Sequence, residues 1–215
     1  MSQEIGDKTK IADDIIDRIK KGIRYTYQNG RKTVDITPAG VYLVMKNNEN
    51  DIGTRPLVDI SFSPPCIWVE STNREGKRIL EPQVGGQYRI AAKVYNIGLM
   101  ASYATFVEFY WLDPTSSEPI STRIHSIGEP KLSTINAGSS VIVRSDVWIP
   151  KDVNEGHECI IVRVYDPILD PIYYEQYDQN VDRHVGQRNI NIIKAAVGTN
   201  SLLAMNLGVL KQVKF

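Results

Sequence analysis

The spacing of apolar residues near the start of the chain is that of a helix. Ile11, Ile15 and Ile19 recur at every fourth position, which puts them on one face of a helix that we expect from Thr9 to about Lys21. Thr9 suits the N-cap, Asp13 and Asp14 lie near the start of the helix, and Lys20 and Lys21 lie near its end, as the helix dipole prefers. A helix of this length is marginal in isolation, so we expect it to pack against another surface.

After this helix the apolar period becomes that of a strand. Apolar positions alternate with polar ones on both sides of Asn29-Gly30: Ile23, Tyr25 and Tyr27, then Val34 and Ile36. Asn-Gly between alternating runs predicts a β-hairpin, because a type I′ turn needs positive φ at both central positions. A candidate strand at 40–45 and a polar linker at 46–54 follow. We therefore expect residues 1–54 to form an extension made of a helix and a hairpin.

From residue 55 the chain consists of short strand-like runs separated by turns. The runs lie at 59–63, 66–69, 88–94, 103–111, 141–149, 159–165 and 185–193, and residues 73–77 are typical of a turn. No long helical pattern intervenes, which is typical of an antiparallel β-sandwich. Pro64-Pro65 places the first strand at an edge or a crossing between sheets, since proline cannot donate to a ladder. We expect an all-β, immunoglobulin-like sandwich over 55–194.

The final segment, 195–215, is apolar, with Lys211 and Lys214 as its charges. It is too apolar for a solvated tail, so it should pack on the domain or pair with another chain. The apolar positions of the helix and of this extension are the residues that we predict to bind a partner protein: Ile11, Ile15, Ile19, Leu202, Leu203, Leu207, Val209 and Leu210.

Charge and hydropathy exclude several classes of partner. Lys plus Arg equal Asp plus Glu at 25 each, so no long-range field would draw nucleic acid or anionic lipid. No run approaches the about 18 apolar residues of a membrane helix, so we expect no membrane insertion. The polar N-terminus, MSQEIGDKTK, lacks the apolar core of a signal peptide. We expect synthesis in the cytoplasm, which is compatible with later release as part of a particle.

The motifs of common enzymes are missing. The sequence has no H-E-x-x-H, Cys-x-x-Cys, G-x-S-x-G or phosphate-binding G-x-x-x-x-G-K-[ST] motif, so we expect no catalytic residues, no metal and no cofactor. The histidines are scattered, although His157 and His184 could approach each other at one end of a sandwich. His125 is the third. Surface or capping roles are the simpler interpretation for all three.

One loop combines acidic and aromatic residues. Its acidic residues are Asp166, Asp170, Glu175, Asp178 and Asp182. They could supply oxygen ligands to calcium, but their spacing matches no EF-hand loop, and a solvated, turn-rich loop is the simpler alternative. Tyr173, Tyr174 and Tyr177 lie in the same loop, where exposed tyrosines would bind a glycan or a protein. Tyrosines also plug the ends of sandwiches, so both interpretations stay open.

The two cysteines, Cys66 and Cys159, are too few for a disulfide framework. They could pair across the sandwich. Two buried thiols that pack as small apolar groups are the alternative that we favour in a chain without a signal peptide.

A series of short motifs, in order, resembles one family over residues 84–193. Tyr88–Gly98 resembles the V-x-V-x-N-x-G strand of bacterial CARDB-like domains, which are immunoglobulin-like sandwiches. The further matches are Val107–Trp111, Ile127-Gly128, Asn136–Ser140 with Val147-Trp148, His157–Asp166, and Val185–Ile190, which has Gly186 where the family commonly has alanine. The resemblance implies an interaction, adhesion or spacer module.

This chain departs from such modules in carrying an extension on each side of a single domain. We therefore expect a non-catalytic structural or adaptor protein that contacts protein subunits, or further copies of itself, in a larger assembly. A phage-like or injection particle is an example by analogy of fold alone. The alternative is a glycan- or surface-binding adhesion module that uses the tyrosines of the 166–182 loop.

Overall fold

The computed structural model describes residues 23–28, 31–36, 40–113, 120–151, 156–172 and 175–194. The predicted helix at 9–21 and the apolar extension at 195–215 lie outside these ranges. The eight residues predicted to bind a partner therefore lie outside them as well. Of the three loop tyrosines, Tyr173 and Tyr174 lie outside the described residues and Tyr177 lies inside.

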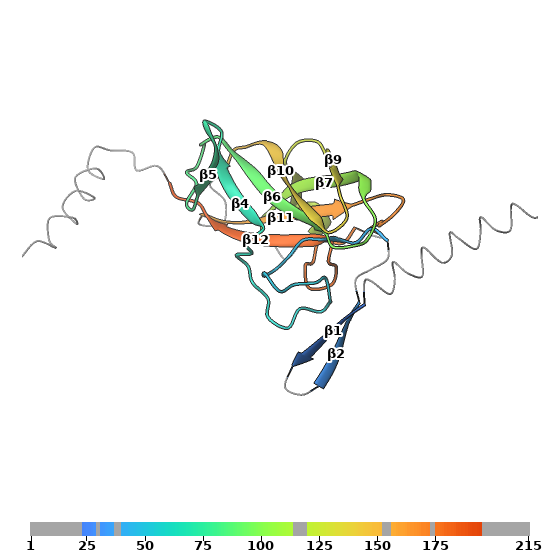
Figure 1. The fold of residues 1–215 in the computed structure, drawn as a ribbon. Coiled ribbons are helices and arrows are strands. Elements are labelled where there is room, and N and C mark those ends of the chain that lie inside the picture. Colours follow the sequence, from blue (N-terminus) through green and yellow to red (C-terminus); the bar gives the residue numbers. More distant parts are fainter. Residues whose placement is uncertain are drawn as a thin grey trace, which may run out of the picture.

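Strands dominate the described residues (Figure 1). In chain order they are β1 (Ile23–Gln28), β2 (Arg31–Ile36), β3 (Leu43–Val44), β4 (Ile67–Ser71), β5 (Arg74–Ile79), β6 (Tyr88–Asn96), β7 (Ser102–Leu112), β8 (Ile124–Ser126), β9 (Lys131–Ile135), β10 (Ser139–Trp148), β11 (His157–Tyr165) and β12 (Val185–Asn191). A short helix, α2 (Ile120–Arg123), comes immediately before β8.

The strands from β3 to β12 form two antiparallel sheets. One has the order β10-β6-β4-β5, with β3 also paired to β6; the other has the order β12-β11-β7-β8, with β9 also paired to β7. The sheets lie face to face in Figure 1. The predicted all-β, immunoglobulin-like sandwich is confirmed.

The core lies between the sheets and follows from the alternation along the strands. Ile90, Ala92 and Val94 of β6 are fully buried in the main apolar cluster, where Val107 of β7 and Val162 of β11 also lie. Burial of a Val or Ile side chain contributes about 1.5–3 kcal/mol. The polar residues between them in β6, such as Arg89 and Lys93, are more exposed. This alternation is the pattern that predicted the strands.

Several local predictions differ from the structure. Residues 73–77, predicted as a turn, lie mostly in β5, where Glu70 of β4 pairs with Arg78. The run at 59–63 is not a strand, because hydrogen bonds to other loop residues occupy part of its backbone. The short strands β8 and β9, which pair with the two halves of β7, were not predicted. β8 is three residues long and mostly exposed, and β9 is five residues long with one buried side chain, that of Ile135, so neither shows a long apolar alternation.

The start of the sandwich also differs from the expected domain organisation. Leu43 and Val44 of β3 pair with Asn96 and Tyr95 of β6, so this part of the expected extension lies in a sheet of the sandwich. Both side chains of β3 are fully buried, and this burial stabilises the pairing of β3 with β6.

The predicted hairpin is present as a separate two-stranded sheet. Its register pairs Ile23 with Ile36 and Tyr25 with Val34, and Gln28 with Arg31. The connection therefore consists of Asn29 and Gly30, as the sequence predicts. Within the described ranges, no helix has the length and apolar character needed to cross a membrane.

The cysteines and histidines take separate places. Cys66 and Cys159 are both free and buried, so the favoured interpretation of two buried thiols is confirmed. The predicted approach of His157 and His184 is wrong. In the β11–β12 register His157 lies opposite Asn191 and Arg163 lies opposite Val185, which places the two histidines at opposite ends of that strand pair. His125 stacks on Trp111, with ring centroids 4.2 Å apart.

Candidate functional site

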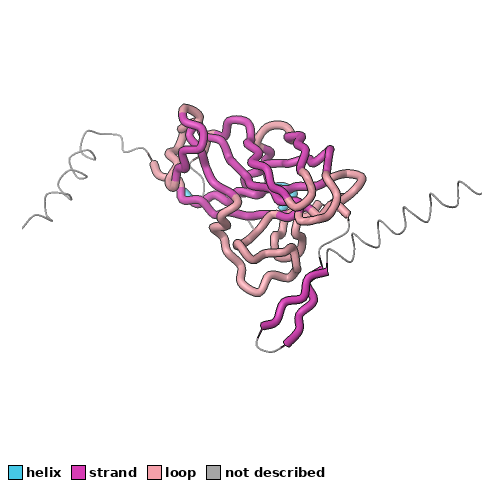
Figure 2. Tube along the Cα trace, viewed as in Figure 1, coloured by secondary structure: helices cyan, strands magenta, loops and turns pink. Residues whose placement is uncertain are grey.

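Two long loops lie side by side next to β12 (Figures 1 and 2). One connects β3 to β4 and is called here the 45–66 loop; the other connects β11 to β12 and is called the 166–184 loop. Hydrogen bonds of backbone and side chains join them. They run from Met45 N–H to Arg183 O (2.9 Å), from Asn47 Nδ2 to Gln179 Oε1 (3.2 Å), and from Leu57 N–H to Asn180 Oδ1 (2.9 Å).

Asp166 shapes the turn that opens the 166–184 loop. Its Oδ1 accepts hydrogen bonds from the N–H groups of Ile168 (3.1 Å) and Leu169 (3.0 Å), and its Oδ2 accepts one from Ser102 Oγ (2.7 Å). Burial opposes ionisation of this carboxyl group, but the hydrogen bonds outweigh burial and hold the pKa of Asp166 below its usual range. The oxygens of this acidic residue are therefore occupied by backbone and hydroxyl donors.

His184 lies between two carboxylates of the same loop. It is 3% exposed. Its Nδ1 lies 2.7 Å from Asp182 Oδ1, and its Nε2 lies 3.3 Å from Asp170 Oδ2, an ion pair without the geometry of a hydrogen bond. Burial lowers the pKa of His184, but the two carboxylates outweigh burial and raise that pKa above its ordinary value. The two carboxylates therefore favour the protonated form of this imidazole more than water favours it in a free histidine.

Asp170 contacts two side chains, the imidazole of His184 and the guanidinium of Arg183. Arg183 Nη2 pairs with Asp170 Oδ1, and the Leu43 backbone N–H donates to Asp170 Oδ2 at 2.6 Å. The Arg183 guanidinium also lies over the ring of Tyr42, 3.9 Å from its centroid, a cation–π contact. Because Leu43 belongs to β3, Asp170 links the 166–184 loop to the sandwich sheet.

The 45–66 loop is fixed from within by Asn47 and Asp51, both buried. The Asn47 amide exchanges hydrogen bonds with the backbone of Ser61, at 2.8 and 2.9 Å. Asp51 accepts hydrogen bonds from the N–H groups of Asn47 and Gly53, each at 2.8 Å, and pairs with Arg55 at 3.0 Å. The stretch predicted as a polar linker is therefore an ordered part of the domain.

The same loops cover part of the outer edge of β12. The Asn189 N–H donates to Phe62 O (2.9 Å), and the Gln187 N–H donates to Gln179 Oε1 (3.2 Å). An unpaired strand edge is a template for another chain. Because these two donors are satisfied, another strand cannot pair with them.

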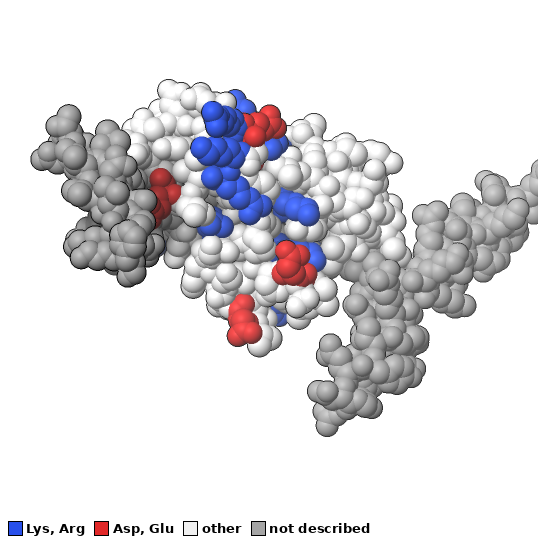
Figure 3. All heavy atoms as spheres, turned by 60° about the vertical axis from the view of Figure 1, so that its left-hand side comes forward, with Lys and Arg blue, Asp and Glu red and all other residues white. Residues whose placement is uncertain are grey.

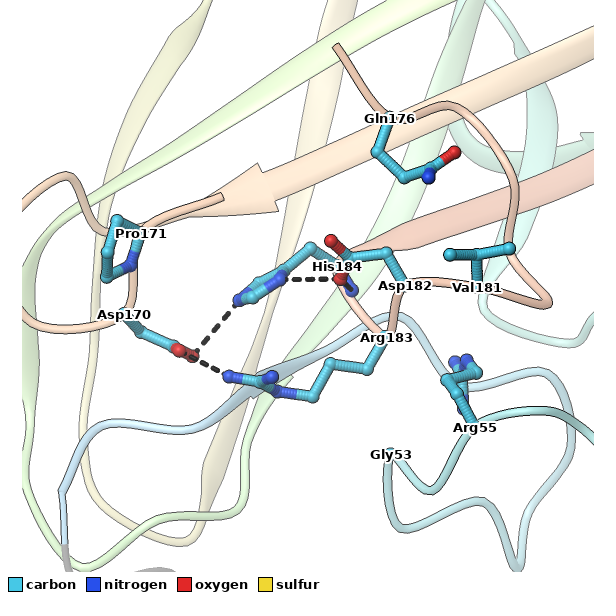
Figure 4. A pocket seen from close by; sticks show the side chains of 9 residues that line it. All are labelled: Gly53, Arg55, Asp170, Pro171, Gln176, Val181, Asp182, Arg183 and His184. Atoms are coloured by element: carbon cyan, nitrogen blue, oxygen red, sulfur yellow. Dashed lines mark hydrogen bonds and ion pairs between the residues drawn. The ribbon is translucent and has the colours of Figure 1, made fainter. Parts of the chain in front are cut away.

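A pocket of about 480 Å³ opens between the two loops (Figure 4). It is lined by Gly53, Arg55, Asp170, Pro171, Gln176, Val181, Asp182, Arg183 and His184. The figure shows Asp170 facing both His184 and Arg183, with Asp182 on the other side of the imidazole. Each charged residue of the lining has an opposite charge beside it.

The charged residues of the pocket hold the two loops together, and few groups in its described lining could react with a substrate. Among the described residues that line the pocket, none is a serine, threonine or cysteine that could act as a nucleophile. Within the described part of the chain, no group of three His, Cys, Asp or Glu residues is placed to hold a metal ion. The acidic residues Asp166, Asp170 and Asp182 accept hydrogen bonds or ion pairs from the protein instead.

The outer surface of the 45–66 loop carries exposed apolar side chains among polar ones. A second hollow, of about 220 Å³, is lined by apolar residues such as Ile52, Pro56 and Val58 and by polar ones such as Asn50 and Asp59. Val58 is 98% exposed, and Ile52, Ile60 and Phe62 are also exposed.

Only part of the site predicted from the sequence can be placed. Tyr177 is partly buried; its ring makes an edge contact with Tyr110 (5.6 Å between centroids) and lies below the Arg163 guanidinium (4.8 Å). Glycan binding by the tyrosine loop stays a prediction. The 45–66 loop was not predicted as a site. The sequence feature that indicates it is the alternation of Val58, Ile60 and Phe62, part of which lies in the run 59–63 that the sequence predicts as a strand.

Comparisons with known proteins give a structural likeness and no sequence match. No protein-family model matches the chain, and no curated protein matches it. A crystal structure of the CARDB domain of a Pyrococcus furiosus protein, in complex with di-metal ions, is similar over 78% of this chain and 99% of that chain, at 10% identity and a TM-score of 0.41. A solution NMR structure of that CARDB domain is similar over 59% of this chain and 94% of that chain, at 13% identity and a TM-score of 0.37.

A β-glucosidase from Erythrobacter marinus is similar over 78% of this chain, which spans 18% of that enzyme, at 12% identity and a TM-score of 0.38. None of the three assigns an activity to this chain.

Proposed function

We propose that this protein is a non-catalytic structural or adaptor protein that makes protein–protein contacts in a larger assembly. The observation that carries the proposal is the 45–66 loop. Its backbone is fixed by buried Asn47 and Asp51, while Ile52, Val58, Ile60 and Phe62 are exposed. A surface that is ordered before binding loses little conformational entropy on association, so more of its burial is expressed as affinity.

The exposed side chains are large enough to anchor a partner. Complete burial of a Val, Ile or Phe side chain contributes about 1.5–3 kcal/mol before the costs of association. A few such anchors carry most of the binding energy in protein interfaces. The hollow lined by Ile52, Pro56 and Val58 would accept one apolar side chain of the partner.

The hairpin gives independent support. β1 and β2 form a two-stranded sheet separate from the two sandwich sheets. An isolated two-stranded sheet is marginally stable at best in water, so docking on another subunit would stabilise it. We also propose that the protein is made in the cytoplasm and acts within a particle, for which a phage-like or injection particle is one model.

Isolation of the tagged full chain from its native host, followed by light scattering and analysis of the recovered subunits, tests the proposal. The parent protein should be recovered in a complex of fixed stoichiometry. Val58→Asp and Phe62→Ser should be recovered as free protein. Leu132→Ser is the matched control, because Leu132 is 64% exposed on β9 in the other part of the fold.

Two outcomes contradict this account. Recovery of the parent protein as a monomer alone would remove the assembly role. Recovery of the same complex with the parent, Val58→Asp and Phe62→Ser would keep the assembly role but remove the 45–66 loop as its contact surface.

A further inference from the structure

The outer face of the sheet that contains β4, β5, β6 and β10 carries a groove that the proposed function does not use. Ile67 and Val69 of β4 belong to the core, so the residues that alternate with them, Trp68 and Glu70, lie on the outer side. In the register, Ala91 of β6 lies between Trp68 and Arg144. A groove of about 510 Å³ opens on this face, and its lining includes Trp68, Arg78, Lys93, Tyr95, Ile142 and Arg144.

The cations of the groove are held in position. Arg144 Nε lies 2.8 Å from Glu70 Oε2, and its Nη1 lies 3.0 Å from Glu75 Oε1. Glu70 itself is buried and also accepts a hydrogen bond from Trp68 Nε1 at 2.7 Å. The Arg78 guanidinium lies over the Trp68 ring, 4.3 Å from its centroid. Such cation–π contacts orient a side chain before any ligand arrives.

Two lysines are placed in the same way over one tyrosine. The ammonium groups of Lys93 and Lys46 lie 5.1 and 5.0 Å from the centroid of the Tyr95 ring. With Arg78 and Arg144 they make four cations in and beside the groove, against Glu49 and Glu70 of the lining and Glu75, which pairs with Arg144. The groove therefore has an excess of positive charge that an anionic ligand would neutralise.

The basic character extends beyond the groove. Arg188 of β12 also reaches this sheet, where its Nη1 donates a hydrogen bond to the backbone O of Ile67 on β4 at 2.8 Å, and burial, together with the neighbouring charge of Arg78, lowers its pKa. Figure 3 shows a row of Lys and Arg side chains across one face of the sandwich, with few acidic side chains among them. Like charges gathered in this way repel one another, and a polyanion relieves that repulsion.

The aromatic rings decide which class of polyanion fits. Sugars and nucleic-acid bases bind by stacking on free aromatic faces, but cations already lie over the rings of Trp68 and Tyr95. The remaining apolar lining consists of Ile142 and Pro65, both exposed. An extended peptide places alternate side chains on alternate sides, so acidic side chains can meet the cations while apolar ones contact Ile142 and Pro65.

From the juxtaposition of ring-supported Arg78 and Lys93 with Arg144 and exposed Ile142, we infer that this groove binds an extended, acidic peptide segment of a partner protein. Glu49 and Pro65 of the 45–66 loop line part of this groove, but Ile52, Val58, Ile60 and Phe62, which carry the proposed function, do not line it. The carboxylates of the peptide pair with Arg78 and Lys93, which are less constrained by protein carboxylates than Arg144. Arg144 sets the shape and charge of one end of the groove.

Titration calorimetry on the full chain tests the inference with three probes: a short peptide alternating glutamate with valine, the same peptide with glutamine for glutamate, and an acidic oligogalacturonate. The glutamate peptide should bind, and its affinity should fall as salt is raised. The glutamine peptide should bind about tenfold more weakly or not at all. The oligogalacturonate should not compete with the glutamate peptide.

Variants locate the binding site. Arg78→Gln and Lys93→Gln should each weaken binding of the glutamate peptide by about two- to fivefold, as expected for exposed ion pairs. The matched control is Lys151→Gln, which removes a lysine placed 5.4 Å over the ring of Trp111 on β7 of the other sheet. Thermal unfolding should be the same for all three variants, so a change of affinity does not reflect a change of fold.

Three results would overturn the inference. One is absence of binding by the glutamate peptide. Another is an equal effect of Lys151→Gln and Lys93→Gln. The third is binding of oligogalacturonate that depends on Arg78 and Lys93 while the peptide does not bind, which would assign the groove to an acidic glycan. None of these results bears on the 45–66 loop.

Discussion

The imidazole of His184 lies 2.7 Å from the carboxylate of Asp182, and its other nitrogen faces Asp170. The residues on either side of this contact hold the 166–184 loop against β3 and the 45–66 loop. Asp170 accepts a hydrogen bond from the Leu43 N–H, and Arg183 O accepts one from the Met45 N–H. A residue that sequence motifs associate with metal binding or catalysis is here part of the framework that presents an apolar surface.

His184 and its two carboxylates predict a pH dependence of stability. The pKa of His184 is raised in the folded state, so its contribution is fully present below the unfolded pKa of about 6.5 and is lost as pH rises through the folded pKa. The free energy of unfolding should therefore fall over that window, by at most about 1.4 kcal/mol per pH unit. Urea denaturation of the parent protein and of His184→Gln, each at several pH values, measures this fall in the free energy of unfolding. A slope that is unchanged in His184→Gln would contradict this role; His157→Gln is the control.

Glu158 predicts a second, separable effect. Burial raises the pKa of Glu158 to about 7, and its Oε2 has no hydrogen-bond partner among the described residues. A raised carboxyl pKa means that stability declines as pH rises from about 4.5 to about 7. Glu158→Gln keeps an acceptor for the Lys151 N–H and should raise the free energy of unfolding at pH 8 by roughly 1–3 kcal/mol. Lower stability of this variant at pH 8, measured by denaturation, would refute the interpretation.

Gly53 should tolerate no side chain. Its φ is +90°, and an added Cβ would lie 2.8 Å from Cε1 of Tyr42, whose ring is held by Arg183. Gly53→Ala should therefore lower the free energy of unfolding by about 2–4 kcal/mol. Gly76→Ala is matched, because Gly76 has a φ of +79° but an added Cβ would have no neighbour within 4 Å. Gly76→Ala should lower the free energy of unfolding by about 1 kcal/mol. Equal costs in chemical denaturation would show that the Tyr42 contact is unimportant.

Both native thiols should be unreactive in the folded protein. Burial raises the pKa of Cys66 to about 12 and that of Cys159 to about 12, so the reactive thiolate is scarce at neutral pH. A colorimetric disulfide reagent should label neither thiol until the protein unfolds, and both in denaturant. Rapid labelling of the native protein at neutral pH would contradict the buried positions of these residues.

The sandwich was predictable because its strands bury alternate residues. In β6, Ile90, Ala92 and Val94 face the core, and the polar residues Arg89 and Lys93 alternate with them, a pattern visible in the sequence. β5 was not predictable in this way, since nearly every side chain of Arg74–Ile79 is exposed. Its pairing with β4 depends on backbone hydrogen bonds, which leave no apolar pattern.

The candidate site was less predictable than the fold. The acidic residues of the 166–184 loop were recognised, but their partners, such as Leu43 and Ser102, are far away in the sequence. Loop residues 46–54 are polar, which is typical of a solvated linker, yet Asn47 and Asp51 are buried because each satisfies backbone groups. Such long-range satisfaction of polar groups is visible only in the folded structure.

The measurement that tests the central claim most directly is thiol labelling of Val58→Cys in the isolated protein and in the complex recovered from the native host. Val58 is 98% exposed, and the two native cysteines are expected to stay unlabelled. The account predicts rapid labelling of Val58→Cys in the isolated protein and strong protection in the complex, while Leu132→Cys is labelled in both. Equally rapid labelling of Val58→Cys in the isolated and assembled protein would contradict the claim that the 45–66 loop is the contact surface.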